Sequence, residues 1–374
     1  MLARRIVDEC LRISENDNVT IFFYPHNLPL VEGIADACFK KGADVLLNLY
    51  TDRFLLSYMT QLSVESLRQP SVFCRTLSEN STAEIWMDGT YDPSILRKIS
   101  AEKSSAAGEG EAKAHWPVSK EKKVKNLSVG SALVTKPRAK TYGFNYVTWN
   151  RMMKEASNVN YHDLAQRGRK LKEALSGAST IRITGPVGTD LKVGVSGRKW
   201  MVSDGIIDET DIQEENFMDE IPAGSIYTAP LEDSAEGRIT FNTAVPYSGR
   251  RYEKIGWTFT HGKVTSFTGD ERVAPLKREW AKSSGDKDRI AYLGLGFNPK
   301  AKPGFTVNNI VSGTVSVGIG GNQDIGGKNE PGFSFVSTIR RATVEADGIP
   351  IIKKGEFVRS FKIPWRVSFQ VEPQ

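Results

Sequence analysis

Three serines in glycine-rich segments are the first candidates for chemistry: Ser225, Ser316 and Ser334. A serine becomes a nucleophile only beside a base that takes its proton. No histidine lies near any of the three in sequence, and none sits in the glycine pattern of a nucleophile elbow. A serine–lysine pair stays open, because folding can bring a distant lysine to a serine.

Metal binding would need histidines and carboxylates that converge in the fold. The four histidines are scattered; His26 follows a predicted strand as a loop or capping residue, and His261 is expected in a hairpin. Four acids flank glycine-rich motifs and could bind a hard cation, although such acids are more often solvated or capping: Glu232, Glu236, Asp324 and Glu330. The glycines of 318–327 lack the ending of a phosphate loop and predict tight turns.

The first half alternates strand and helix patterns, which is typical of a parallel α/β sheet. Apolar periodicity predicts a helix over 1–13, and a βαβ unit follows with strands at 19–24 and 44–50 around a helix at 29–41. Further on, the pattern predicts a strand at 83–87, a helix at 161–175 and a closing strand at 180–184. Between them, 102–125 has almost no apolar periodicity and is interpreted as a mobile surface insertion.

After Gly185 the sequence changes to short strand patterns separated by Gly, Pro and Asp, with one helix near 270–283. The expected fold is therefore an N-terminal parallel-sheet α/β domain over 1–184, followed by a β-rich α+β domain over 185–374. This division agrees with the length of 374 residues, which exceeds what one core usually fills.

Several local patterns occur together and in one order. They are 137–143 with Trp149, 185–191 with 197–198, 221–232, 293–299, 313–322 with 326–327, and 347–348. In this combination the chain resembles the thermophilic aminopeptidase family, of the aminopeptidase T and S type, over roughly 1–358. The resemblance implies an aminopeptidase T type fold and a homodimer whose catalytic domains face each other. It also implies a site where two metal ions clamp the attacking water and the substrate carbonyl.

Carried over position by position, the residues that hold metal or act as base in the family are replaced here. Ser225 and Tyr292 stand where the family has Glu, Asn309 stands in place of the general base Glu, and Ser316 and Ser334 stand in place of His. Val336 replaces an Asp, and Gln323 aligns loosely with a tyrosine. Every replacement is uncharged. Carboxylates packed at one point repel each other once the metal is gone, so this joint neutrality is what a metal-free site predicts.

The expected function is therefore binding of a peptide or small polar ligand in the former cleft, without peptidase activity, cofactor or metal. The ligand-contacting residues would be Ser225, Tyr292, Asn309, Ser316, Gln323 and Ser334. Two alternatives stay open: an enzyme of altered chemistry in a specialised biosynthetic or catabolic pathway, and a metallo-aminopeptidase with relocated ligands. Dihydroxypyridine ring-cleaving dioxygenases resemble the same family, but their histidine and aspartate ligands to iron are missing here as well.

Composition excludes several other classes. The net charge is only +6 and much of the excess lies within 113–140, which is typical of a solvated face and not of a nucleic-acid site. No signal peptide or membrane span is visible. The three cysteines have no metal-binding spacing, and Cys10 and Cys38 fall on apolar helix positions. We therefore expect a cytoplasmic protein with reduced thiols.

Overall fold

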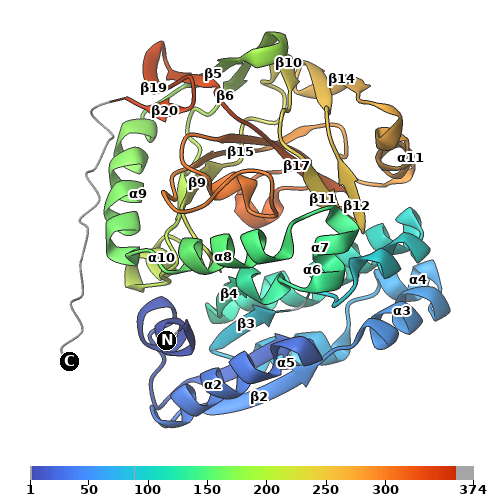
Figure 1. Cartoon of the computed structure of the whole chain (residues 1–374), viewed down its shortest axis with the longest axis vertical. Coiled ribbons are helices and arrows are strands. Elements are labelled where there is room, and N and C mark those ends of the chain that lie inside the picture. The colour runs from blue at the N-terminus through green and yellow to red at the C-terminus, as the bar shows by residue number, and fades with distance from the viewer. Residues whose placement is uncertain (1, 88, 359–374) are drawn as a thin grey trace.

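A five-stranded parallel sheet forms the first half of the chain (Figure 1). The computed structural model describes residues 2–87 and 89–358. All neighbours in this sheet run parallel. The strand order is β2 (Asp44–Leu49), β1 (Asn18–Phe23), β3 (Ala83–Met87), β4 (Lys125–Val129) and β8 (Met218–Ile221). Strand β1 is apolar and buried from Val19 to Phe23, as expected of a central strand of such a sheet.

Helices connect these strands and pack around the sheet. A π-helical turn, Ile6–Cys10, continues the first helix and buries Ile6, Val7 and Cys10. The connecting helices are α1 (Leu2–Arg5), α2 (Leu28–Phe39), α3 (Asp52–Gln61), α4 (Val64–Arg68), α5 (Val72–Asn80), α6 (Ala101–Lys122), α7 (Lys136–Tyr142), α8 (Tyr146–Ser157) and α9 (Tyr161–Leu175). The βαβ unit, β3 and α9 confirm the predictions from hydrophobic periodicity.

Two antiparallel sheets form most of the second half, together with a hairpin of β11 (Val245–Tyr247) and β12 (Arg250–Tyr252). The larger sheet has the order β14 (Lys263–Thr268), β13 (Gly256–Thr260), β10 (Glu236–Thr240), β6 (Thr189–Gly194), β5 (Thr180–Gly185), β18 (Thr343–Ala346), β19 (Ile349–Lys353) and β20 (Glu356–Phe357). The smaller has the order β17 (Ser334–Ile339), β16 (Val315–Gly320), β15 (Ile290–Gly296), β9 (Ser225–Thr228) and β7 (Met201–Ser203). Two helices accompany them, α10 (Glu209–Gln213) and α11 (Ala274–Lys282).

The core of this half lies between the two antiparallel sheets. Trp257 of β13 meets Phe335 of β17 with ring centroids 6.1 Å apart, so side chains from the two sheets are in contact. Leu293, Leu295 and Val317 alternate with glycines and polar residues along β15 and β16, and all three are fully buried. One face of the five-stranded antiparallel sheet therefore packs on the core, and its other face is left for a different role.

Three features differ from the sequence-based expectation. The segment 102–125, interpreted as a mobile insertion, instead forms the 22-residue helix α6. Its buried positions are mostly small residues, such as Ser105, Ala106, Gly110 and Ala114, which carry little hydropathy signal. A Cβ on Gly110 would lie 2.2 Å from the carbonyl oxygen of Leu67, so only glycine permits this close approach.

The other two differences concern strand partners. Strand β5, expected to close the parallel half, pairs antiparallel with β6 and β18 in the eight-stranded sheet. Strand β8 comes after the expected boundary at Gly185, yet it pairs parallel with β4 in the first sheet. The chain therefore crosses between its halves more than once. The division into domains at 184/185 stays a prediction, and residues 359–374 of the second part lie outside the described residues.

Candidate functional site

The face of the five-stranded antiparallel sheet that points away from this core, itself largely covered by other segments, brings together most of the positions singled out in the sequence. Strand register places Tyr292 opposite Gly318, and Gly318 opposite Val336. Ser316 lies opposite Gly294, and Ser225 lies opposite Gly296. Since side chains alternate along a strand, all four non-glycine side chains point from the same face. Ser334, two residues before Val336, belongs to this face as well.

Glycines in the Leu-Gly-Leu-Gly motif make room on this face. A Cβ on Gly294 would lie 2.6 Å from the Oη atom of Tyr292, so the tyrosine ring lies directly over this glycine. A Cβ on Gly318 would lie 3.0 Å from the Cβ of Tyr292 and 2.8 Å from a methyl group of Val336. The ring of Tyr292 also stacks on Tyr227, with centroids 5.5 Å apart and an interplanar angle of 21°. The pair of tyrosines forms an aromatic layer over the glycines.

Asn309 reaches the same region from a short 3-10 turn, Asn308–Ile310. A Cβ on Gly296 would lie 2.6 Å from the backbone oxygen of Asn309, so this turn packs against the sheet opposite Ser225. The side-chain amide of Asn309 donates a 2.9 Å hydrogen bond to the carboxylate of Glu220 on β8. Burial raises the pKa of Glu220, and the hydrogen bond from Asn309 acts in the opposite direction. The pairing of β8 with β4 is what brings this acid to the site.

The residues on this sheet face do not suit a pair of divalent cations. Ser316 is fully buried, with its hydroxyl 2.8 Å from that of Thr338, and Ser225 is 2% exposed. Burial also raises the pKa of Tyr292 well above its usual value, so its phenol stays protonated. Divalent metals of the zinc type need carboxylates, imidazoles or thiolates at close range. Within residues 2–87 and 89–358, no group of three or more His, Cys, Asp or Glu side chains is placed to hold a metal ion.

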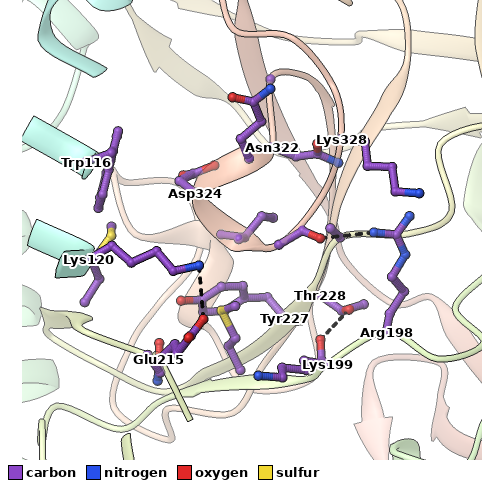
Figure 2. Close-up of a pocket in the computed structure, with 18 of the residues that line it drawn as sticks. Trp116, Lys120, Arg198, Lys199, Glu215, Tyr227, Thr228, Asn322, Asp324 and Lys328 are labelled. Atoms are coloured by element: carbon purple, nitrogen blue, oxygen red, sulfur yellow. Dashed lines mark hydrogen bonds and ion pairs between the residues drawn. The ribbon is translucent and has the colours of Figure 1, made fainter. Parts of the chain in front are cut away.

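A cavity of about 900 Å³ opens beside this face (Figure 2). Tyr227 lines it from β9, Trp116 and Lys120 from α6, and Asp324 from the glycine-rich segment after β16. Gln323 and Ser334 line it too, whereas Ser225, Tyr292, Asn309, Ser316 and Val336 do not. Tyr292 touches the cavity only through its stacking partner Tyr227. The cavity therefore has walls from both halves of the chain.

Ion pairs hold the charged rim of this cavity. Lys120 pairs with Glu215 at 3.1 Å. Arg198 is largely buried, pairs with Glu232, and donates a 3.2 Å hydrogen bond to the carbonyl of Gly326. Glu232 also accepts a bond of 2.8 Å from the backbone N–H of Lys328. Glu232, considered above as a cation ligand, therefore links the glycine-rich segment to the loop of Arg198 between β6 and β7.

Sequence reasoning missed the α6 wall of the cavity. Lys113, Trp116 and Lys120 all line it. Their spacing of three and four residues puts them on one face of a helix, and this signal was present in the sequence. It was overlooked because the segment was interpreted as an insertion.

Among the described residues that line the cavity there is no histidine, although His115 contacts Trp116 and Ser119, which do line it. His26 occupies a short turn after β1, where its Nε2 is 3.2 Å from the carbonyl of Ala132. His261 lies in the hairpin between β13 and β14, as predicted. His115 of α6 lies between two hydroxyls, with Nδ1 3.0 Å from Ser78 and Nε2 3.3 Å from Ser119. Glu84 lies 3.5 Å from this ring.

This serine–histidine–glutamate cluster is enclosed. Ser78 and Glu84 are 0% exposed, and His115 is 5% exposed, so no substrate reaches them. Burial lowers the pKa of His115 to about 4 and raises the pKa of Glu84 to about 7. Both groups therefore stay neutral in the folded protein at mildly acidic pH. The cluster is a structural one within the first half.

The raised pKa of Glu84 predicts a pH-dependent stability. An unfolded glutamate has a pKa of about 4.3, so the folded chain holds the proton more tightly. The resulting stabilisation is present below about pH 4 and is lost as the pH rises through about 7. Glutamine stays uncharged at every pH, so the Glu84→Gln variant keeps this stabilisation at high pH. We expect its free energy of unfolding at pH 8 to exceed that of the wild type by roughly 2–3 kcal/mol.

Urea denaturation of both proteins at pH 5 and pH 8 measures this difference. The matched control is Glu79→Gln, because Glu79 on the same α5–β3 region is exposed and pairs with Arg75. A Glu84→Gln protein that is less stable than the wild type at pH 8 would contradict the assignment.

Comparison with known sequences finds similarity to metallopeptidases. The sequence profile described as thermophilic metalloprotease (M29) matches residues 1–285. Over 114 residues the chain is 31% identical to the aminopeptidase PepS of Streptococcus thermophilus. This stretch covers 30% of the chain and 26% of PepS, so the similarity spans about a quarter of that relative's length.

Solved structures show the same fold over nearly the whole length. AmpT from Thermus thermophilus matches with a TM-score of 0.72 at 16% identity, covering 96% of this chain and 98% of AmpT. The 2,5-dihydroxypyridine dioxygenase from Pseudomonas putida matches with a TM-score of 0.63 at 14% identity, covering 96% of each chain. At such identities the likeness shows a shared fold. It confirms the expected architecture of a parallel-sheet half followed by antiparallel sheets.

Proposed function

Because the chain belongs to the thermophilic metalloprotease (M29) family, we propose that it is a divergent, metal-free relative of the two-metal aminopeptidases that binds a peptide or small polar ligand. One observation carries this proposal: the sheet face that should present the ligands presents Ser225, Tyr292 and Ser316 instead. Tyr292 packs over Gly294 and Gly318, and the hydroxyl of Ser316 is hydrogen-bonded to that of Thr338. A cavity of about 900 Å³ beside them is large enough for a short peptide.

The ligand would lie against Tyr227, Gln323 and Ser334, which line the cavity. Ser225 and Ser316 support it from beneath: both are buried, and Ser316 is bonded to Thr338. The ring of Tyr227 and the amide of Gln323 offer the two kinds of contact, apolar surface and hydrogen bonds, that ligand pockets combine. These contacts support the proposal of peptide binding in the cavity.

A hydrolysis assay tests the proposal. We expect no cleavage of leucine p-nitroanilide above the rate in buffer, in the presence of either Zn²⁺ or Co²⁺. The physical reason is that no carboxylate or imidazole stands on the sheet face to hold an ion and polarise the scissile carbonyl. The positive control is any active member of the family in the same assay. Metal-dependent turnover by the purified chain would reinstate the alternative of relocated ligands.

A second candidate, an enzyme of altered chemistry, is favoured by Glu220. Its pKa is raised by burial, and it lies close enough to Tyr227 and Tyr292 to raise their pKa values as well. Carboxyl groups of this kind are candidates for acid–base catalysis. The discriminating measurement is mass spectrometry of a bound ligand before and after incubation. Conversion that is lost in Glu220→Gln would favour this candidate over simple binding.

We also propose that the chain is a homodimer. The resemblance implies a contact between catalytic domains; in addition, the edge strand β2 of the first half leaves Leu46, Leu47 and Leu49 exposed, and a second copy could cover them. Light scattering at micromolar concentration should therefore give twice the 41.4 kDa of one chain. A measured mass of one chain would contradict the proposed dimer but would leave the proposed ligand site unaffected.

We propose a cytoplasmic location as well. Cys10, Cys38 and Cys74 are free thiols, and the first two are buried, as predicted from their helix positions. In the part of the chain that the structure describes, no helix has the length and apolar character needed to cross a bilayer.

A further inference from the structure

The cavity beside the former metal face carries an excess of basic side chains. Among the described residues, its acidic lining consists of Glu214, Glu215 and Asp324. The basic side chains in its lining are more numerous: Lys113, Lys120, Arg198, Lys199 and Lys328. The replaced residues on the sheet face are neutral, as the sequence predicted, but the walls above that face are charged.

Most of the acids in this region already have partners. Glu215 pairs with Lys120, and Glu214 pairs with Lys172, which lies outside the cavity lining. Glu232 is engaged with Arg198. In contrast, Lys113, Lys199 and Lys328 form no ion pair within residues 2–87 and 89–358, and all three side chains are solvent-accessible. Asp324 is the one acid of the described lining without an ion pair, so three unpaired lysines stand against one carboxyl group and the charge available to a ligand is positive.

These basic groups stand on opposite sides of the cavity. The unpaired Lys113 belongs to α6, the helix that carries Trp116 on one side, and the unpaired Lys328 lies on the other side, with Tyr227 between them (Figure 2). Positive walls that face each other across a confined space reinforce the potential felt by a ligand. A cationic α-amino group, which every aminopeptidase substrate carries, would meet like charge on both sides and no carboxylate cluster on the sheet face.

We infer that the cavity takes an acidic ligand, namely a peptide or small molecule that carries carboxylate groups. This inference rests on the proposed function and names the ligand class for the same site. Carboxylates would bind Lys199 and Lys328, and the backbone or apolar part of the ligand would lie against Trp116 and Tyr227. The sheet-face residues alone predicted only a peptide or small polar ligand, without a sign of charge.

Two peptides of nearly equal size but different charge distinguish the effect of ligand charge on affinity from the effect of ligand shape. Isothermal titration calorimetry is performed with Ala-Glu-Glu-Ala and with Ala-Gln-Gln-Ala, at one fixed ionic strength. We expect the glutamate peptide to bind at least tenfold more tightly, and its affinity to fall as NaCl rises because the walls are partly exposed. Equal affinities, or tighter binding of the glutamine peptide, overturn the inference and leave the proposed peptide-binding function standing. Binding of neither peptide overturns both.

Variants then locate the binding. Lys328→Ala and Lys199→Ala should each weaken the glutamate peptide about tenfold, the loss typical of one charge-assisted hydrogen bond, and leave the glutamine peptide unchanged. The control is Lys40→Ala, because Lys40 is exposed at the end of α2, far from the cavity in the first half. A loss in Lys40→Ala equal to that in the cavity variants would show nonspecific attraction and overturn the inference.

A third arm distinguishes carboxylate from phosphate. Sodium phosphate is titrated against the bound glutamate peptide, with total ionic strength held constant by NaCl. A carboxylate site should keep its peptide at millimolar phosphate. Complete displacement under these conditions would assign the cavity to phosphate groups and overturn the carboxylate part of the inference.

Discussion

Replacing Asn298 by alanine should lower the free energy of unfolding by about 3–5 kcal/mol. Asn298 is 0% exposed and follows the Leu-Gly-Leu-Gly motif at the end of β15. Its amide donates to the carbonyls of Ala156 at 3.1 Å and Ala223 at 2.6 Å. Its side-chain oxygen accepts from the backbone N–H groups of Lys300 and Ala301. Removing the side chain leaves four backbone groups without partners in a region closed to water.

The control for this loss is Asn242→Ala. Asn242 also bonds a backbone carbonyl and a backbone N–H, both of Arg340, but it is exposed and water can replace it. We expect a loss of under about 1 kcal/mol there. Thermal or urea unfolding of both variants measures the difference. Similar small losses in both would show that the motif asparagine is not a structural anchor, and would reopen a role for it in ligand binding.

Replacing Gly296 by alanine should cost about 3 kcal/mol of stability or more. The new methyl group would lie 2.4 Å from the carbonyl oxygen of Val311 and 2.6 Å from that of Asn309. Both atoms are backbone, so the turn that carries Asn309 has to move away from the sheet. The hydrogen bond from Asn309 to Glu220 would be lost with it.

Two other glycines serve as controls for Gly296→Ala. In Gly294→Ala the nearest atoms to the new methyl group belong to the side chain of Tyr292 and not to the backbone, so a smaller loss and a disturbed Tyr227–Tyr292 stack are expected. Gly108→Ala in α6 meets no atom within 4 Å and should stabilise the protein by about 0.5–1 kcal/mol. Urea denaturation ranks the three. Equal stability of Gly296→Ala and Gly108→Ala would contradict the close packing described for the site.

Periodicity predicted the elements that bury a continuous apolar stripe. Strand β3 and helix α9 begin and end at the predicted residues: β3 is a short, mostly apolar run, and α9 has apolar residues at helical spacing, among them the buried Leu164, Leu171 and Leu175. Helix α6 was missed since its buried face is made of alanine, serine and glycine. The pairing of β8 with β4 was also not predictable from local patterns, because it joins residues about ninety positions apart in the chain.

For the candidate site, too, the sequence predicted some of the residues and missed others. Motif frames located the sheet face, and register now places Ser225, Tyr292, Ser316 and Val336 on it. They did not locate Glu220, which arrives through β8, or the basic wall from α6, which depends on how the two halves pack. The charged residues of the cavity come from segments that are far apart in the sequence, such as Lys120 of α6 and Lys328 after β16. Neutrality at the motif positions therefore gave an incomplete description of what the cavity would bind.

The most direct test of the central claim is the metal content of the purified chain. The protein is incubated with excess Zn²⁺ or Co²⁺, dialysed, and analysed by inductively coupled plasma mass spectrometry. With Ser225, Tyr292, Ser316 and Ser334 in place of carboxylates and imidazoles, we predict well below one metal ion per chain. Two metal ions per chain, retained through dialysis and lost on chelation, would contradict a metal-free site.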